Sequence, residues 1–532
     1  MGTYFNPNNG SFRKDSRSKI YVDKTGLIEI LNDRINTSGN CIALSHARRF
    51  GKSQAAGMID AYYSCGSDSE ELFSKFEIAA KPDFKTHLNQ YNVIHLDISS
   101  FTDRNPENPV DLILTNLDRE IRAQYPDVPD FSNPIGTVLM DVYEKSGRAF
   151  VIIIDEWDCI IRNRAGHPEE VHRYLQFLHS LFKSEEAKSF LALAYITGIL
   201  PIKKIKDESA LNNFREYTML DSKNLTPYFG FTEDEVKALC DTYRMNFESV
   251  KDWYNGYDIN GIHMYNPNSV AQAMEEGKLD SYWKNTSAFS TINDLITLNF
   301  DGLREDILTM LEGGRAAVNV RHFQNDLSII NTKDDALTAL IHLGYLGYDQ
   351  EFEEAYLPNY EVSLAYQAAL ATGSWGKIAE NISRCQELLN ATIRKNADRV
   401  AELVEQAHDA YTSILKYNDE NSLSCVLTMA YFTAPAYYTI IRECPAGKGY
   451  ADMIFLPRRE AGSRPAMVIE LKWNHSADTA IRQIREKHYP DVLKGYGKEI
   501  LLVGIRYDKD SPVKKHSCRI ESILQDHPDG KS

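Results

Sequence analysis

The sequence contains no hydrophobic run long enough to cross a membrane. Its longest largely apolar run covers residues 190–202 and is interrupted by Thr197, Gly198 and Pro201, whereas a membrane-spanning helix needs about 20 apolar residues. Residues 1–6 also lack the apolar core of a signal peptide. We therefore expect a cytoplasmic protein with no membrane partner.

Closely spaced cysteines are missing as well. No C-x-x-C pair occurs, and the closest two of the eight cysteines are 19 residues apart. Zinc sites and small disulfide-rich domains both need denser spacing. We expect reduced, mostly buried thiols.

The chain has no overall excess of positive charge. It carries 59 Lys and Arg against 75 Asp and Glu, a net charge of −16, and nucleic-acid binding needs clustered basic residues. The acidity is uneven, however. From residue 371 onward there are 23 basic and 21 acidic side chains, a balance of +2, which leaves −18 for residues 1–370. The last third is therefore still compatible with a nucleic-acid partner.

The length of 532 residues predicts about three domains. Residues 1–225 alternate short β-rich runs with helical patterns, which is typical of an α/β fold with a mostly parallel sheet. Continuous apolar runs such as 151–154 suit strands that are buried on both faces. The expected strands are 41–45, 92–98, 150–155, 190–197 and 217–220.

The remaining chain predicts two further domains. Residues 226–370 read as a helical, lid-like or winged-helix-like domain, in which Thr232 and Glu235 form a capping box and residues 355–362 form a short extended segment. Residues 371–532 read as a second α/β domain. Its expected helices are 377–389, 397–416, 422–431 and 477–487, and its expected strands are 437–442, 450–456, 466–471 and 499–506.

The first predicted strand leads into a sequence close to the Walker A pattern G-x-x-x-x-G-K-[ST]. Gly51, Lys52 and Ser53 fit this pattern, although His46 replaces its first glycine. Gly51 would let the backbone approach phosphate, Lys52 would reach the β- and γ-phosphates, and the Ser53 hydroxyl would ligate Mg²⁺. A chance G-K-S in a strand-to-helix turn is the alternative.

Arg48 and Arg49 add positive charge to this predicted phosphate loop. The strand 150–155 then ends in Asp155 and Glu156, a Walker B pattern. Asp155 would hold Mg²⁺, and Glu156 would act as the general base toward water. At the end of the next strand, Thr197 could sense the γ-phosphate or simply terminate the strand. ATP and Mg²⁺ are therefore the expected cofactors.

A second group of charged residues lies in the last third. Glu470 and Lys472 stand two apart on a predicted strand, so both project to one face while Leu471 projects to the other. If strands 450–456 and 466–472 form a hairpin, Asp452 meets Glu470. Paired carboxylates bind hard divalent cations, and a nearby lysine can stabilise a phosphodiester transition state. An ordinary cross-strand salt bridge is the alternative.

Several further residues could complete this second site. Glu420 is a candidate metal ligand, and Gln483 is a candidate catalytic residue on the predicted flanking helix, with Tyr489 just after it. For Gln483 and Tyr489, a plain surface role is equally open. The residues that could form a phosphate-contacting surface, or simply a solvated charged face, are Lys472, Arg482, Arg485, Lys487, Lys494 and Lys498.

Short motifs along nearly the whole chain resemble one bacterial family of proteins. These motifs are Tyr21-Val22-Asp23-Lys24-Thr25, Arg48-Arg49-Phe50-Gly51-Lys52-Ser53, Ile153-Ile154-Asp155-Glu156-Trp157-Asp158, Ile196-Thr197-Gly198-Ile199, Trp253-Tyr254-Asn255-Gly256-Tyr257, Tyr265-Asn266-Pro267, Tyr282-Trp283, Gly344-Tyr345-Leu346, Pro358-Asn359-Tyr360-Glu361-Val362, Gly449-Tyr450-Ala451-Asp452 and Glu470-Leu471-Lys472. The family it resembles has an AAA-ATPase-like N-terminal region and a C-terminal PD-(D/E)XK nuclease-like domain.

This resemblance implies a P-loop NTPase of the ASCE/AAA type coupled to a restriction-endonuclease-like nuclease fold. The family's phosphate loop also tends to lack the first glycine, as His46 does here. The sequence departs from the family at Tyr450-Ala451, where a residue such as Arg is expected before Asp452. We expect an ATP-controlled, Mg²⁺-dependent nuclease that acts on DNA, with RNA and a homo-oligomeric state left open. The alternative is a nucleotide-dependent switch or scaffold whose nuclease-like domain binds a partner or nucleic acid without cleaving it.

Overall fold

The computed structural model describes most of the chain. The residues outside the described part are 1, 164–166, 203–210, 283–287, 299, 301, 312, 322, 324–329, 373–375, 412–426, 428–429, 432–433, 435–436, 447–448, 458–463, 474–475, 494–495, 497–498, 509–515 and 526–532. The chain divides into two compact units. Unit 1 comprises residues 1–285 and 298–363, and unit 2 comprises residues 286–297 and 364–532. The three-domain boundaries expected from the sequence stay a prediction.

Unit 1 is built on a parallel five-stranded sheet, as the sequence predicts. Its strands are β1 (Cys41–Ser45), β2 (Asn92–Asp97), β3 (Phe150–Asp155), β4 (Leu191–Gly198) and β5 (Arg215–Thr218), in the order β2-β3-β4-β1-β5. Strand β4 therefore separates β1, which leads into the Walker A loop, from β3, which carries the Walker B residues. This is the strand order of the ASCE class of P-loop NTPases that we expect from the sequence.

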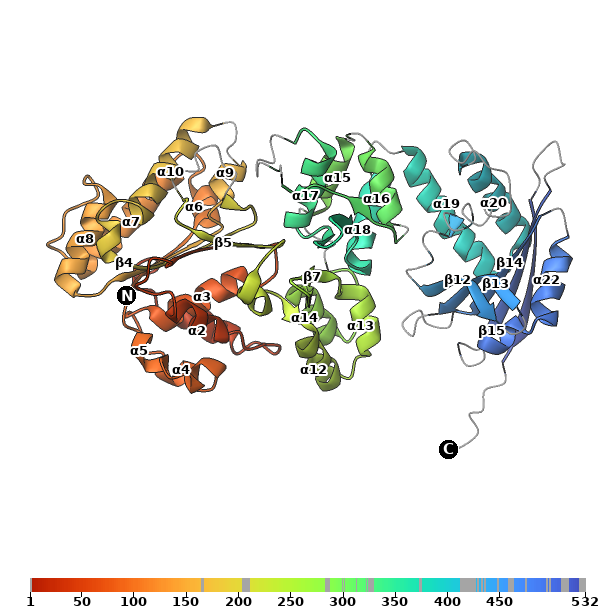
Figure 1. The fold of residues 1–532 in the computed structure, drawn as a ribbon, viewed down its shortest axis with the longest axis horizontal. Helices are drawn as coiled ribbons and strands as arrows, with labels where there is room; N and C mark the ends of the chain where they lie inside the picture. The colour runs from red at the N-terminus through yellow and green to blue at the C-terminus, as the bar shows by residue number, and fades with distance from the viewer. Residues whose placement is uncertain are drawn as a thin grey trace. The chain divides into compact units, whose positions relative to one another are not determined.

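Helices cover both faces of this sheet, which explains its continuous apolar strands. Figure 1 shows α7 (Pro109–Gln124), α8 (Ile135–Ser146) and α10 (Pro168–Phe182) on one side, and α2 (Gly26–Asn32) and α3 (Lys52–Tyr63) on the other. Alternate residues of β3 enter the two cores: Ile152 and Ile154 pack under the first group of helices, and Val151 and Ile153 under the second.

The rest of unit 1 contains helices and two small antiparallel sheets, β6-β8-β7 and β10-β11-β9. The small sheets consist of β6 (Phe231–Thr232), β7 (Tyr257–Ile259), β8 (Ile262–Tyr265), β9 (Ala316–Ala317), β10 (Gly347–Asp349) and β11 (Glu354–Tyr356). The helices are α12 (Glu233–Tyr243), α13 (Phe247–Tyr254), α14 (Pro267–Glu276), α16 (Leu303–Leu311) and α17 (Lys333–His342). The capping box of Thr232 and Glu235 is present at the start of α12, as predicted.

The extended segment predicted at 355–362 is wrong in its second half. Strand β11 ends at Tyr356, and helix α18 (Tyr360–Thr372) begins four residues later. The side chain of Asn359 accepts a hydrogen bond from the backbone N–H of Val362 at 3.0 Å and so caps the new helix.

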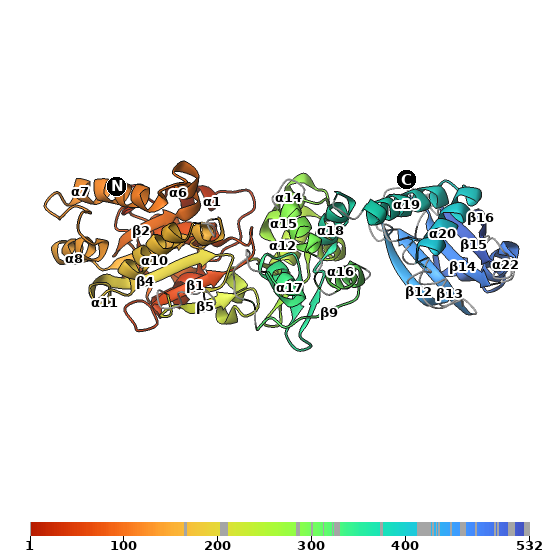
Figure 2. The ribbon, with the colours of Figure 1, turned by 90° about the horizontal axis from the view of Figure 1, so that it is seen from above.

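Unit 2 contains a mixed five-stranded sheet in sequential order (Figure 2). Strands β12 (Tyr438–Ala446), β13 (Gly449–Pro457) and β14 (Ala466–Trp473) form an antiparallel meander. Helix α22 (Ala477–Glu486) then leads to β15 (Glu499–Tyr507), which is parallel to β14, and β16 (His516–Leu524) adds an antiparallel edge. This confirms the predicted α/β unit, although the sequence analysis missed β16.

Two hydrophobic layers hold the unit 2 sheet. Helices α19 (Gly376–Ile393) and α20 (Ala397–Tyr411) pack on one face against Ile469 and Leu471, whereas α22 packs on the other face against Val468. The predicted end of the second helix at 416 and most of the predicted helix 422–431 lie outside the described residues. No described helix combines the length and apolarity needed to cross a membrane.

Candidate active sites

The Walker A segment forms a loop between β1 and α3. Gly51 has a φ of +87° directly before the first turn of α3, a conformation that glycine adopts without strain. The Lys52 ammonium donates hydrogen bonds to the carbonyl oxygens of His46 and Ala47, both at 2.8 Å. Burial lowers the pKa of Lys52, while the carboxylate of Glu156 raises it. The lysine thus satisfies two carbonyl oxygens of its own loop.

His46, which stands where the Walker A pattern has glycine, anchors this loop to the core. Its fully buried ring places Nε2 2.5 Å from the Ser222 hydroxyl, which itself donates to the Thr218 carbonyl at 2.6 Å. The hydroxyl therefore accepts from the ring, and Nε2 carries the proton. Burial, followed by the charge of Lys52, lowers the pKa of His46 to about 3, so the ring is neutral. His46 is absent from the cavity lining, which explains how the loop accommodates a side chain here.

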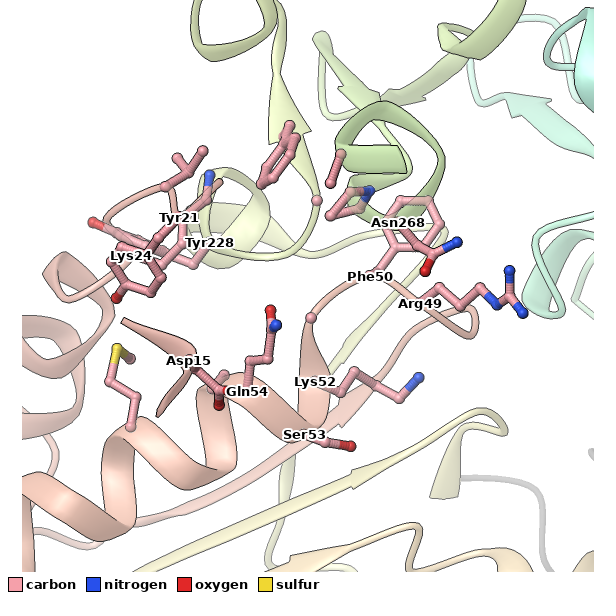
Figure 3. Close-up of a pocket in the computed structure, with 18 of the residues that line it drawn as sticks. Asp15, Tyr21, Lys24, Arg49, Phe50, Lys52, Ser53, Gln54, Tyr228 and Asn268 are labelled. Atoms are coloured by element: carbon pink, nitrogen blue, oxygen red, sulfur yellow. The ribbon is translucent and has the colours of Figure 1, made fainter. Parts of the chain in front are cut away.

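A cavity of about 420 Å³ lies beside the Walker A loop. Figure 3 shows Lys52 and Ser53 on one side of it and Tyr21, Lys24 and Tyr228 on the other. The start of α14 closes a further part of the wall. The cavity is lined by Phe12, Asp15, Ile20, Tyr21, Val22, Lys24, Arg48, Arg49, Phe50, Gly51, Lys52, Ser53, Gln54, Ala55, Met58, Glu156, Tyr228, Gly230, Phe231, Pro267, Asn268, Ala271 and Gln272.

The structure therefore brings most of the predicted nucleotide-site residues to one cavity. Arg48, Gly51 and Ser53 line it directly, and Arg49 also donates a hydrogen bond to the carbonyl oxygen of Tyr282 at 3.0 Å. Tyr21, which lies in one of the family motifs, lines the same cavity.

Asp155 and Thr197 meet at the carboxyl ends of β3 and β4. The Thr197 hydroxyl donates a hydrogen bond to Asp155 Oδ1. Asp155 is 5% exposed, and Thr197 is fully buried. Because the two strands are neighbours in a parallel sheet, their ends share one edge, and the predicted pair lies together there.

The next turn packs tightly against the end of β4. A Cβ atom added to Gly198 would lie 2.7 Å from Trp157 Cδ1 and 2.8 Å from Asp158 Oδ1. The backbone N–H of Trp157 also donates to the Thr197 carbonyl at 2.9 Å. The motifs 153–158 and 196–199 are thus two halves of one packed junction.

Glu156 lines the cavity. Its carboxylate is bound by Arg162, a residue that the sequence did not suggest for this site. Arg162 Nη2 lies 2.8 Å from Glu156 Oε2, and Arg162 Nε lies 2.8 Å from Asp158 Oδ2. Burial raises the pKa of Glu156, and the charges of Lys52 and Arg162 oppose this shift. The four-residue spacing of Asp158 and Arg162 within a helical pattern was a signal that could have indicated the pair.

The second predicted site lies on the β13–β14 hairpin. Met453 faces Ile469 in its register, and the Leu471 backbone N–H donates to Asp452 Oδ2 at 2.7 Å. Leu471 itself packs into the layer under α19 and α20. The expected pairing of the two strands and the opposite placement of Leu471 are both confirmed.

Glu470 is the centre of this group. Lys472 Nζ lies 3.0 Å from Glu470 Oε1, and the side-chain amide of Gln483 on α22 donates to the same oxygen. The residue is 1% exposed. Burial and the charge of Asp452 raise the pKa of Glu470 to about 7, against an opposing effect of Lys472.

The residues around Glu470 fit a divalent cation. Its second carboxylate oxygen, Oε2, is buried and has no hydrogen-bond partner among the described residues. A cation bound there would also relieve the repulsion from Asp452. Within the described part of the chain, no cluster of three or more His, Cys, Asp or Glu residues forms a metal site, and Glu420, the further predicted ligand, lies outside that part.

Helix α22 reaches Glu470 because Gly504 has no side chain. Gly504 pairs with Glu470 across β14 and β15, and a Cβ atom added to it would lie 2.6 Å from the Ala477 carbonyl oxygen. The close approach of the helix brings Gln483 to the carboxylate. The glycine therefore has a packing role that the sequence analysis did not identify.

The predicted basic surface around α22 is partly neutralised. Arg485 forms an ion pair with Glu521 at 2.7 Å, and Lys472 points to Glu470. Tyr489 is fully buried and so has no surface role. The last two lysines of the predicted surface, Lys494 and Lys498, lie outside the described residues.

Two family comparisons match these two parts of the chain. Residues 11–206 match the sequence model of a family described as a predicted AAA-ATPase, and residues 418–517 match that of the PD-(D/E)XK nuclease superfamily. A protein of Azotobacter chroococcum mcd 1, named as an uncharacterized protein in the vnfD 5′ region, is 24% identical over 524 residues, which are 92% of this chain and 93% of that protein.

Similar solved structures include the ORC2 protein of Aeropyrum pernix in ADPNP-ADP complexes, with a TM-score of 0.30 and 12% identity over 72% of this chain and 99% of that one. AMPPCP-bound DnaA from Aquifex aeolicus has a TM-score of 0.24 and 10% identity over 69% and 90%. Likenesses this weak carry no argument, so the fold assignment rests on the strand orders and the family matches. The chain combines an AAA-ATPase-like domain with a C-terminal domain of the PD-(D/E)XK nuclease superfamily, the architecture that its sequence motifs imply.

Proposed function

We propose that this protein is an ATP-binding and ATP-hydrolysing enzyme coupled to an Mg²⁺-dependent nuclease that acts on DNA. The observation that carries the nuclease part is the buried Glu470 carboxylate, which has one oxygen without a partner among the described residues and lies beside Asp452. Lys472 pairs with Oε1, and a metal cation would supply the missing partner of Oε2. The cavity at the Walker A loop supports the nucleotide part.

At the nucleotide site, the proposed roles follow from which residues reach the cavity. Gly51 lets the loop backbone approach phosphate. Lys52 would donate hydrogen bonds to phosphate oxygens in place of the loop carbonyl oxygens. Arg48 and Arg49 add positive charge. The helix dipole of α3 favours an anion at the same place.

The remaining nucleotide-site residues act around the terminal phosphate. Ser53 and Asp155 would hold Mg²⁺, with Thr197 fixing Asp155. Glu156 accepts a proton from the attacking water. Mg²⁺ bound to these residues would neutralise phosphate charge during transfer.

At the nuclease site, Asp452 and Glu470 would hold Mg²⁺, which would activate water for attack on the phosphodiester. Lys472 places a positive charge beside the scissile phosphate. Gln483 fixes the orientation of the Glu470 carboxylate by donating to Oε1. These residues lie on strands β13 and β14 and on helix α22, within the residues that the PD-(D/E)XK match covers.

The rival function is a nucleotide-dependent switch that binds nucleic acid or a partner without cleaving it. The observation that favours its partner-binding form is the ion pair between Arg485 on α22 and Glu521, which reduces the positive charge available to nucleic acid. This rival predicts nucleotide-dependent association with no cleavage.

Cleavage of labelled DNA and RNA by the purified full chain tests the proposal. The reactions contain Mg²⁺ or Mn²⁺, with and without ATP, and include the Glu470→Ala variant. We expect DNA cleavage that this variant abolishes. The nuclease proposal fails if neither nucleic acid is cut, or if cutting survives in the variant, and preferential cutting of RNA would reassign the substrate.

A further inference from the structure

Arg162 forms a fixed bridge between two acidic residues at the edge of the nucleotide cavity. Its Nη2 contacts Glu156 Oε2 and its Nε contacts Asp158 Oδ2, both at 2.8 Å. The arginine side chain is only 9% exposed. A planar guanidinium can satisfy both contacts at once, whereas a lysine amine at the same position offers a single point of charge.

Asp158 holds this bridge to the end of β4. Its Oδ2 also accepts hydrogen bonds from the backbone N–H groups of Ile199 and Leu200, at 3.2 and 3.0 Å. Asp158 is 1% exposed. The guanidinium is therefore anchored to the same strand end that presents Thr197 to Asp155.

The bridge occupies only one oxygen of the Glu156 carboxylate. Oε2 is bound to Arg162, whereas Oε1 has no hydrogen-bond partner among the described residues, and the side chain lines the cavity together with Lys52 and Ser53. Glu156 also has a φ of +53°, in the left-handed region that a glutamate rarely adopts. Such a backbone persists where surrounding contacts hold it in place.

We propose that Arg162 is the positioning residue for Glu156: by holding Oε2, it orients Oε1 toward the water that attacks the terminal phosphate of ATP. The inference rests on the proposed ATPase function and adds a residue to it. The arrangement follows the general design in which a third group orients the base of a catalytic pair. Arg162 acts through Glu156 and takes no proton itself.

A double-mutant cycle in steady-state ATP hydrolysis tests this role. The variants are Arg162→Gln, Glu156→Gln and the double substitution, with Arg173→Gln as the matched control, because Arg173 forms an exposed ion pair with Asp111 away from the cavity lining. We expect Arg162→Gln to lower kcat by about 10- to 100-fold, a part of what a general base contributes, and to change KM by less than about threefold.

The decisive comparison is made in the Glu156→Gln background. There, Arg162→Gln should lower kcat by less than about twofold, since a positioning residue has no effect once its partner cannot act. The inference is overturned if Arg162→Gln lowers kcat as much in the Glu156→Gln background as in the wild-type background. It is also overturned if Arg162→Gln lowers kcat in neither background. The control should retain wild-type kcat, and a loss there as large as in Arg162→Gln would overturn it as well.

Arg162→Lys provides a second test in case the Arg162→Gln variant does not fold. It keeps the charge but not both contacts, so we expect a kcat between those of wild type and Arg162→Gln, again with no effect on Glu156→Gln. Thermal unfolding of each variant accompanies the kinetics. A wild-type protein that hydrolyses no ATP overturns the ATPase proposal together with this inference. Hydrolysis that requires Glu156 but is indifferent to Arg162 overturns the inference alone.

Discussion

The two candidate sites solve the same electrostatic problem in different ways. Each places two carboxylates close together in a largely buried setting. At the nucleotide site, Arg162 contacts Glu156 and Thr197 contacts Asp155, so each of these acidic groups has a partner within the protein. At the nuclease site, Lys472 and Gln483 both bind one oxygen of Glu470 and leave the other without a partner in the described chain.

This difference indicates how each site depends on its ligand. At the nucleotide site, the charges of both Lys52 and Arg162 oppose the rise that burial causes in the pKa of Glu156. The nuclease site has less compensation, and its most buried carboxyl group has a raised pKa. A cation should therefore matter more for the stability of the nuclease site than ATP does for that of the nucleotide site.

The largest expected effect is the loss of ATP hydrolysis in one variant and of DNA cleavage in another. Lys52→Ala should lower ATP hydrolysis by at least about 100-fold, and Glu470→Gln should lower cleavage by a similar factor, as for other loss of electrostatic stabilisation. ATP hydrolysis by Glu470→Gln should equal that of the wild type. The control Glu402→Gln changes an exposed residue, and it should keep wild-type rates of both ATP hydrolysis and DNA cleavage. Equal loss of ATP hydrolysis and cleavage in Glu470→Gln would contradict the assignment of the two activities to two different sites.

A smaller effect concerns pH and metal removal at the nuclease site. The pKa of Glu470 rises from 4.5 to about 7 on folding, so between these values the folded state keeps a proton that the unfolded state releases. The resulting stability is fully present below pH 4.5 and is lost as the pH rises through 7, an effect of roughly 3 kcal/mol.

Pulse proteolysis of the full chain in urea and EDTA, with unit 2 fragments followed between pH 5 and 8, measures this dependence. Glu470→Gln should remove most of the pH slope, and added Mg²⁺ should restore stability at pH 8. A wild-type slope that is unchanged in the glutamine variant would rule out Glu470 as its source.

His46 should give the nucleotide-binding unit a slope of opposite sign. Folding lowers the pKa of His46 from 6.5 to about 3, so its contribution is present above pH 6.5 and is lost as the pH falls toward 3. Acidification from pH 7 to pH 5 should therefore lower the free energy of unfolding by about 2 kcal/mol through His46. His46→Gln keeps a donor for Ser222 but cannot take up the extra proton, so unit 1 of this variant should lose less stability on acidification. Equal losses in both proteins would contradict this explanation.

The smallest effects come from two glycines that allow close packing, one at each site. Gly198→Ala would press on Trp157, and Gly504→Ala would press on the Ala477 carbonyl, each at a cost of about 1–3 kcal/mol. Gly57→Ala is the control, because its Cβ would meet Ser11 at an ordinary 3.5 Å. Urea unfolding should show loss of stability in unit 1 for Gly198→Ala and in unit 2 for Gly504→Ala, and none for the control. An unaffected unit would show that its glycine has no packing role.

The sequence predicted those parts of the molecule that short-range patterns control. Four β-branched residues before Asp155 indicated a strand buried on both faces, and the spacing of Glu470 and Lys472 indicated their common face. The parallel sheet and the β13–β14 hairpin both followed from such patterns. The family resemblance predicted a phosphate loop without the first glycine, but the contact between His46 and Ser222 was not foreseen.

Long-range packing explains most of what the sequence did not reveal. Strand β16 was missed because it forms an edge of the sheet and alternates polar with apolar residues weakly. The role of Arg162 depends on the left-handed turn at Glu156, which composition does not indicate. The packing role of Gly504 depends on how closely α22 approaches β15, and only the folded structure determines that distance.

Cleavage measured with and without ATP tests the central claim, that the nucleotide site controls the nuclease site. Wild type and Lys52→Ala are compared on the same DNA in Mg²⁺, with Glu470→Ala as the blank. The account predicts that ATP changes the cleavage rate of the wild type by about tenfold or more, on the scale of an ordinary coupling free energy, and leaves that of Lys52→Ala unchanged. An equal response to ATP in both proteins, or none in the wild type, would contradict it.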